Sequence, residues 1–249
     1  MNKNEDRMRK VFMWSGVAAS AIMIGFGIAS LVLGLNGRST VFSAIKQERI
    51  TGSGDMTPSG IAPTIEEILA AQQKIAAAQE QAGIPADQRF ELTEVSAPGC
   101  SVAEKPVDSG GRAKCFAEYM RIHALSSSGG LVYSQMGRFT ASDDAPLKST
   151  DYNGGTSDEK YALIDPKTKQ PVSNGKRNLW INEVALATAL NTSYMAEQIS
   201  LFGVGVGVAL LLTGIGFLVV LSGILWRTRR SETETTVGAR SPTPSSSGG

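Results

Sequence analysis

A run of 26 residues without a charged side chain, Leu201–Trp226, constrains this chain more than any other feature. About 20 apolar residues are enough for a helix to cross the hydrocarbon core of a bilayer. No water is present there to satisfy backbone amide and carbonyl groups, so an apolar segment of this length is stable as a helix. A buried helix of a soluble protein is the alternative, but a soluble core rarely needs so long an uncharged run. We therefore expect a transmembrane helix.

A second uncharged run of 25 residues, Val11–Leu35, lies near the N-terminus. A cleaved signal peptide is the alternative, but its apolar region spans about 7–15 residues and ends at a small-residue cleavage site, which does not follow this run. Barrel strands are shorter and alternate in polarity, which neither run does. We therefore expect an uncleaved helix that also crosses the membrane.

Charges beside the two runs predict their orientation. Basic residues lie on the outer flank of each run: Lys3, Arg7, Arg9 and Lys10 precede the first, and Arg227, Arg229 and Arg230 follow the second. Positive flanks stay in the cytoplasm, and tryptophan prefers the headgroup level, where Trp14 and Trp226 would then lie. The sequence predicts a multi-pass plasma-membrane protein with both termini cytoplasmic.

This topology divides the chain into five parts. They are a cytoplasmic N-terminus at 1–10, a transmembrane helix at 11–35, an extracytoplasmic domain at 36–200, a second transmembrane helix at 201–226 and a cytoplasmic tail at 227–249. The tail is rich in Ser, Thr, Pro and Gly and should be disordered, because it cannot bury a core. The domain has 16 Lys and Arg against 19 Asp and Glu, a net charge of −3, which argues against a nucleic-acid-binding surface.

Both cysteines of the chain, Cys100 and Cys115, fall in the region expected outside the cytoplasm. A disulfide is the natural state there, and two free thiols would be expected in a reducing compartment. The bridge would close a short loop and stabilise the fold by roughly 3 kcal/mol. Two cysteines and one histidine, His123, lack the spacing of a zinc site, so we expect no metal and no cofactor.

The extracytoplasmic domain should be mostly helical with long loops. Thr64–Glu67 fits a capping box, and apolar residues then recur at steps of three and four as far as Ala82. Gln72 and Gln79 border this apolar face and would keep it narrow. Gly83, with Pro85 behind it, is a typical end for such a helix.

Two further helices and a pair of short strands are expected along the rest of the domain. Arg112–Leu125 has helical spacing, and one face carries Cys115, Phe116, Tyr119, Met120 and His123. Tyr161–Val172 places a turn between two brief apolar pieces that could be strands. From about Arg177 no Gly or Pro interrupts the chain before Gly203, so we expect one helix over Arg177–Trp226, continuous with the second span. The fold class is therefore mainly α.

Small residues recur at steps of four or seven in both apolar runs. They are Gly203, Gly207 and Gly214 in the second run, and Ala21, Gly25 and Ala29 in the first. Small side chains let helices approach closely in lipid, where no hydrophobic effect drives their association. The pattern fits homodimerisation or docking to another membrane protein, but we favour packing of the two spans against each other. Neither span has an ionisable residue, which argues against an ion or proton path.

His123 is the single histidine and the one obvious candidate for acid–base catalysis. A hydrolase would need a carboxylate that orients this base and a nucleophile within reach. Glu118 lies five residues earlier and off the His123 face, Ser126 to Ser128 follow directly, and no nucleophile-elbow motif is present. We expect a packed or capping histidine, and no catalytic residues.

Several phrases resemble a family of two-pass integral membrane proteins of actinobacteria that has no established activity. They lie within Cys100–Phe139 and Pro171–Gly216, and include RAKCFAEYMRIHAL, GGLVYSQMGRF, PVSNGKRNLW and ALNTSYMAEQISLFGVGVGVALLLTGIG. The resemblance covers about a third of the chain. It implies a bacterial plasma membrane and an outward-facing domain, and it implies no enzymatic activity.

These patterns predict a membrane-anchored interaction or structural protein that displays a disulfide-stapled helical domain. An envelope sensor or an accessory subunit of a larger membrane complex is the alternative, and an enzyme with an exterior active site is the third reading. The expected partners are the lipid bilayer, a second copy of the chain or another membrane protein.

Overall fold

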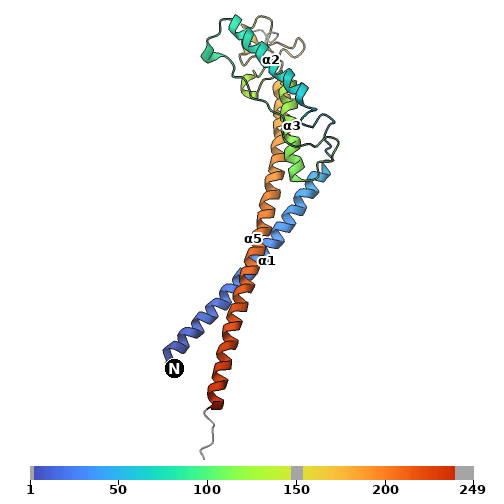
Figure 1. The fold of residues 1–249 in the computed structure, drawn as a ribbon. Helices are drawn as coiled ribbons and strands as arrows, with labels where there is room; N and C mark the ends of the chain where they lie inside the picture. The colour runs from blue at the N-terminus through green and yellow to red at the C-terminus, as the bar shows by residue number, and fades with distance from the viewer. Residues whose placement is uncertain (1–2, 147–153, 239–249) are drawn as a thin grey trace, which may run out of the picture. The chain divides into compact units, whose positions relative to one another are not determined.

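The computed structural model describes residues 3–146 and 154–238 and is mainly helical (Figure 1). Its two longest helices are α1 (Lys3–Gln47) and α5 (Gly175–Gly238). Both contain a segment long and apolar enough to cross a membrane, and only 11% of each apolar window is buried. The expected mainly helical class with two long apolar helices is therefore confirmed.

The chain forms two compact units: Met1–Arg38 with Ile199–Gly249, and Ser39–Gln198. Helix α5 runs without interruption through the boundary at Gln198, as the absence of helix breakers indicated. It also continues past Trp226, where we expected a disordered tail to begin, because no Gly or Pro lies between Arg227 and Gly238. The rest of the expected tail, 239–249, lies outside the described residues.

In the first unit, α1 and α5 pack antiparallel along a seam of small residues. The pairs that meet are Ser20 with Gly214, Gly27 with Gly207, and Gly34 with Ser200. A Cβ added to Gly207 would lie 2.8 Å from the Gly27 carbonyl oxygen, and one added to Gly34 would lie 2.7 Å from the Ser200 carbonyl oxygen. Each helix repeats its small residue every seven positions, which keeps the same stripe toward its partner.

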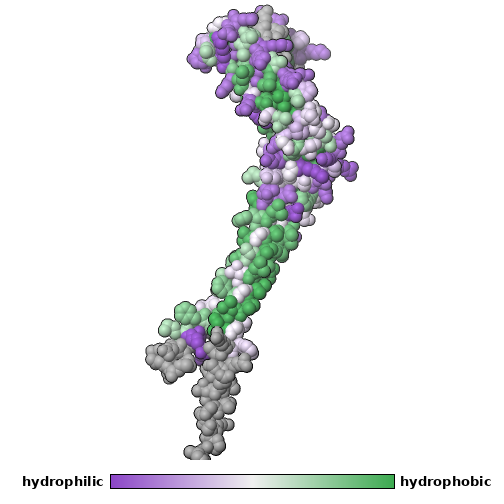
Figure 2. Space-filling view, viewed as in Figure 1, coloured by the Kyte–Doolittle hydropathy of each residue, from purple (hydrophilic) through white to green (hydrophobic). Residues whose placement is uncertain are grey.

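The face of this helix pair that Figure 2 shows is largely apolar. Large side chains with more than half of their surface exposed include Phe12, Phe26, Leu33, Phe202 and Leu212. Contiguous apolar surface of this kind is far beyond what a water-facing helix pair tolerates. The inward position of Ser20 does not break the pattern, because its hydroxyl donates to the Gly16 carbonyl 2.8 Å away.

The second unit has its own core, to which α2 (Ala62–Gln81), α3 (Gly110–Ser128) and the first part of α5 contribute. The largest fully buried apolar side chains are Ile61, Ile68, Val102, Val107, Tyr119, Leu125 and Leu131. Helix α3 lies against α5: a Cβ added to Gly110 would lie 2.8 Å from the Tyr194 Cα, and the Arg121 guanidinium lies 5.7 Å from the centre of the Trp180 ring.

Helix α2 differs from the expectation at its start and on its buried face. It begins at Ala62 with no side-chain cap, because Pro63 presets the helical φ in the first turn, so the capping box at Thr64 is wrong. Gln72 and Gln79 do not border the face but are buried. The Gln72 Nε2 donates to the Gly130 carbonyl at 3.0 Å, and the Gln79 Oε1 accepts from the Phe90 amide at 2.8 Å.

Short elements connect these helices: η1 (Ala86–Gln88), η2 (Tyr133–Gln135) and η3 (Glu159–Tyr161). Among the described residues there is no strand, so the expected strands within Tyr161–Val172 are wrong; isolated bridges such as Ile164 to Pro171 take their place. Asp165 turns the chain between them, because its carboxylate accepts from the backbone amides of Lys167 and Thr168.

Gly207→Ala should destabilise the α1–α5 pair by about 1–3 kcal/mol, because the added methyl meets backbone atoms that cannot move aside. Gly205→Ala is the matched control on the same helix, since a Cβ there meets nothing within 4 Å. Thermal unfolding of the full chain in a neutral detergent measures the difference. Equal melting temperatures for the two variants would contradict the seam.

Candidate functional site

The exposed side of α3 carries the features from which a site could be built. Its N-terminus is fixed by Ser109, whose hydroxyl accepts from the Arg112 amide, and by the Glu197 carboxylate of α5, which accepts from the Gly110 amide at 2.7 Å. The helix ends where Gly129 takes a left-handed φ of 75°. These contacts hold α3 in place under the loop that precedes it.

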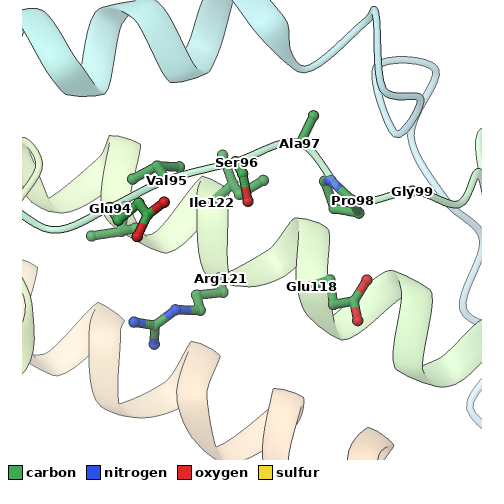
Figure 3. A pocket seen from close by; sticks show the side chains of 10 residues that line it. Glu94, Val95, Ser96, Ala97, Pro98, Gly99, Glu118, Arg121 and Ile122 are labelled. Carbon is green, nitrogen blue, oxygen red and sulfur yellow. The ribbon is translucent and has the colours of Figure 1, made fainter.

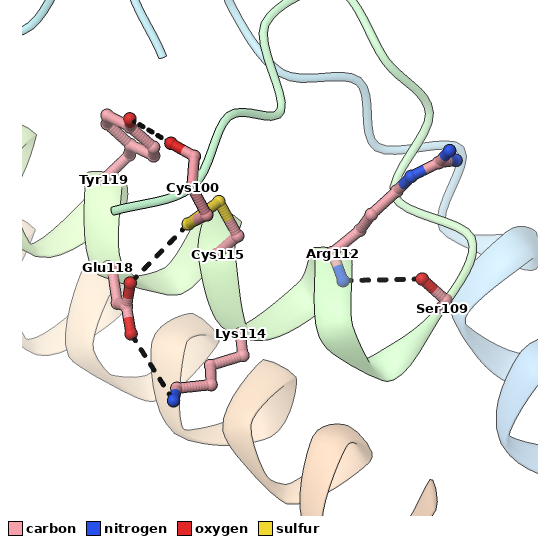
Figure 4. The surroundings of a disulfide bond; sticks show 7 residues. All are labelled: Cys100, Ser109, Arg112, Lys114, Cys115, Glu118 and Tyr119. Atoms are coloured by element: carbon pink, nitrogen blue, oxygen red, sulfur yellow. Dashed lines mark hydrogen bonds and ion pairs between the residues drawn. A yellow bond between two sulfur atoms is a disulfide. The ribbon is translucent and has the colours of Figure 1, made fainter. Parts of the chain in front are cut away.

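A disulfide fastens this loop to α3 (Figure 4). The Cys100 and Cys115 sulfurs are 2.09 Å apart, and the Cα atoms are 6.1 Å apart. The Tyr119 hydroxyl, from the next turn of α3, donates to the Cys100 carbonyl at 2.7 Å. The Glu118 carboxylate approaches Cys100 Sγ to 3.7 Å, which is a close contact and no hydrogen bond, because a disulfide sulfur has no proton.

Burial of the Tyr119 ring keeps its hydroxyl protonated, so that it can act as a hydrogen-bond donor. The ring is fully buried, and burial, followed by the charges of Glu118 and Asp55, raises the pKa of the Tyr119 hydroxyl above 10.0. The hydroxyl therefore stays protonated and serves as a donor to the loop. The disulfide and the hydrogen bond from Tyr119 both hold Cys100 against α3. They therefore fix the end of the extended segment that precedes Cys100, Leu92–Gly99.

A cavity of about 410 Å³ lies between this extended segment and α3 (Figure 3). Val95, Ile122 and Leu125 form its apolar wall, and Glu94, Glu118 and Arg121 supply charged groups around it. The Glu118 carboxylate also pairs with Lys114 at 3.8 Å. A cavity with an apolar wall and a few charged groups can bind an organic group.

His123, near the end of α3, has a carboxylate partner that its own helix does not provide. Its Nε2 lies 2.8 Å from the Asp55 Oδ2, and the other oxygen of that carboxylate accepts from the Ser53 hydroxyl at 2.5 Å. The pair joins α3 to the loop before α2. In this arrangement the serine contacts the carboxylate and not the imidazole, so the three residues lack the order of a nucleophile activated by a histidine base.

The six residues predicted to pack the helices differ in position: the three on α5 lie at the contact with α1, and the three on α1 do not face α5. Gly207 and Gly214 are buried against α1, and a Cβ at Gly203 would lie 3.7 Å from the Gly34 Cα. Ala21, Gly25 and Ala29 are exposed, and a Cβ at Gly25 would meet nothing within 4 Å. On α1 the residues that meet α5 are instead Ser20, Gly27 and Gly34, which were not predicted.

No group of three or more His, Cys, Asp or Glu side chains suited to a metal ion occurs in the part of the chain that the structure describes. Comparison of the chain with protein-family models, with curated proteins and with solved structures found no match. The interpretation of the site therefore depends on its geometry.

Tyr119→Phe should cost about 1–2 kcal/mol of unfolding free energy, because the Cys100 carbonyl loses its donor beside the core. Tyr161→Phe is the control, since its hydroxyl has no hydrogen bond among the described residues. Urea unfolding, followed by the fluorescence of the buried Trp180 in a background with Trp14→Phe and Trp226→Phe, measures both. Equal midpoints would show that the hydroxyl contributes nothing.

Asp55→Asn should destabilise the second unit at neutral pH but not in strong acid. The Ser53 hydroxyl, and then His123, hold the pKa of the Asp55 carboxyl below 3.8. A lowered pKa in the folded state stabilises above the unfolded value of about 4, and this contribution is lost as the pH falls through the folded value. The side chain is 40% exposed, so the effect should stay below about 1 kcal/mol.

The measurement is the melting temperature of both proteins between pH 7 and pH 2. We expect a gap that closes below about pH 4, whereas Asp143→Asn, at an exposed carboxyl, should show no gap. A gap that persists unchanged at pH 2 would contradict the assignment to the Asp55 charge.

Proposed function

We propose that this chain is a two-pass plasma-membrane protein that holds a disulfide-stapled helical unit outside the cytoplasm as a binding module. The observation that carries the proposal is that the two units differ in where their apolar side chains lie. Apolar side chains face outward on the paired helices, whereas the residues between them form a core of their own. The first arrangement suits lipid and the second suits water.

The position of the disulfide supports this sidedness. Bonds of this kind persist in oxidising spaces and are rare where glutathione keeps thiols reduced. Basic flanks at both ends of the chain independently favour cytoplasmic termini. The disulfide and the basic flanks involve different residues and favour the same side of the membrane for the second unit.

A binding role is favoured over catalysis by what the charged side chains of α3 already do. His123 joins α3 to the Asp55 loop, and Glu118 pairs with Lys114. The cavity beside Val95 is bounded by an apolar wall and exposed charges, which fits recognition of a partner better than activation of a nucleophile.

A second candidate is an accessory subunit that docks through α5 to a larger membrane complex. Between Asn178 and Trp226 this helix has two charges, Glu183 and Glu197. Large apolar side chains remain exposed before the span begins, with Ile181 at 45% and Met195 at 61%. A helix of another protein could cover that face.

Photo-cross-linking in intact cells tests the proposal. A photoreactive amino acid replaces one exposed side chain on each surface of the second unit: Leu92, Tyr133, Leu163 or Met195. Phe26, exposed on α1 at 65%, is the lipid-facing control. A binding module should give a discrete protein adduct from at least one of Leu92, Tyr133 and Leu163.

The other outcomes separate the two candidates. Protein adducts from Met195 alone would favour the accessory subunit and contradict a module that binds through its exposed domain. Monomer at all positions would contradict both.

A further inference from the structure

The extended segment Leu92–Gly99 has a backbone without partners between two fixed ends. Before it, the Phe90 amide donates to Gln79, and the Glu91 carbonyl accepts from Gln135 Nε2 at 2.9 Å. After it, the Cys100 carbonyl accepts from Tyr119. Within the described chain, no backbone amide or carbonyl from 92 to 99 makes a hydrogen bond.

Side chains from Thr93 to Ser96 alternate as they do in a strand. Thr93 and Val95 are partly buried, and Val95 packs against the core, whereas Glu94 and Ser96 are exposed. When alternate side chains of an extended segment point into a surface, its backbone N–H and C=O bonds point along that surface. The result is an open, strand-like backbone edge with no strand beside it in the part of the chain that the structure describes, which is a template for pairing with another extended chain.

The cavity of about 410 Å³ lies beside this edge, between Val95 and α3. In Figure 3 the segment passes over α3, with Glu94 at one end of the cavity and Glu118 on the helix below. An added strand would place every second side chain toward such a surface, which is how strand-binding domains select partners. The wall formed by Ile122 and Leu125 suits an apolar side chain.

Charge along the edge indicates the sign of the partner. Glu91 and Glu94 are exposed and have no ion-pair partner within the described ranges, whereas Glu118, which lines the cavity, is paired with Lys114. The one cation at the cavity, Arg121, stacks over the Trp180 ring. An unmatched acidic edge attracts a basic partner and repels an acidic one.

We propose that Leu92–Gly99 is a docking edge for an extended, basic segment of another protein, which pairs with this backbone as an added strand and inserts an apolar side chain into the cavity beside Val95. This assignment rests on the proposed role as a binding module and names its site and the class of its partner. Backbone pairing gives the affinity, and the acidic edge with the apolar cavity gives the selectivity.

Hydrogen–deuterium exchange of the full chain in dodecyl maltoside tests the edge. The probe is an acetylated and amidated decapeptide of alternating lysine and valine. A second peptide has the same sequence with alternate backbone nitrogens methylated, which removes strand pairing but keeps charge and interaction with the detergent. The unmodified peptide should slow exchange of the amides within 92–99 at least tenfold at saturation, because each paired amide gains a protein hydrogen bond.

Three comparisons decide the result. The methylated peptide should bind at least tenfold more weakly, and a glutamate–valine peptide should bind more weakly than the lysine form. Glu91→Gln with Glu94→Gln should weaken the lysine peptide by about two- to tenfold, whereas Asp143→Gln, away from the edge, should not. Unchanged exchange within 92–99, or equal binding of the methylated peptide, would overturn the docking edge, and equal binding of the glutamate peptide would overturn its basic partner.

Failure here is distinguishable from failure of the proposed function. If cross-links form from Tyr133 or Leu163 while the lysine peptide leaves 92–99 unprotected, the chain is a binding module that uses another surface. If no position of the second unit forms a protein adduct, the module itself is contradicted.

Discussion

Contact between the backbones of α1 and α5 is the interaction on which the rest of the structure depends. In lipid the hydrophobic effect no longer drives helices together, so close packing of small residues has to hold the pair. Gly27 meets Gly207, and seven residues further along α1 Gly34 meets Ser200. This register also brings Gly37 to Ser200, so residues 37 and 200 of the first unit are neighbours. The intervening residues 39–198 are closed into a loop, which removes part of the entropy that their folding must overcome.

Within that loop, a small core is supported by covalent and polar contacts. The bridge from Cys100 to Cys115 and the Tyr119 hydroxyl attach one connection to α3, and His123 attaches another through Asp55. Two buried glutamines attach loops to α2 in a similar way. Gln72 donates to the backbone carbonyl of Gly130, and Gln79 accepts from the backbone amide of Phe90. The loops of this unit are thus positioned by single side chains from helices. The segment at 92–99 differs because its backbone makes no hydrogen bond within the described residues, although Val95 packs against the core.

Much of the architecture follows from the hydropathy of the sequence and from the positions of its helix-breaking residues. An uncharged run of about this length is stable in a membrane as a helix, and no Gly or Pro interrupts residues 177–202 before the second run, so the two long helices could be predicted. The packing seam could not, because Ala21 and Gly25 satisfy the same small-residue pattern as Ser20 and Gly27, and only tertiary packing separates the two faces. Gln72 was misplaced because its burial depends on a carbonyl 58 residues away. Asp55 is likewise 68 residues from His123, and no local pattern connects them.

The central claim is that the second unit lies in an oxidising space outside the cytoplasm, held there by the two apolar helices. The most direct measurement is the redox state of Cys100 and Cys115 in intact cells, trapped with a membrane-permeant alkylating reagent before lysis and read by mass spectrometry of non-reduced peptides. The account predicts a linked pair of peptides with no alkylation at either cysteine. Full alkylation of both cysteines in cells would place them in a reducing compartment and would contradict the account.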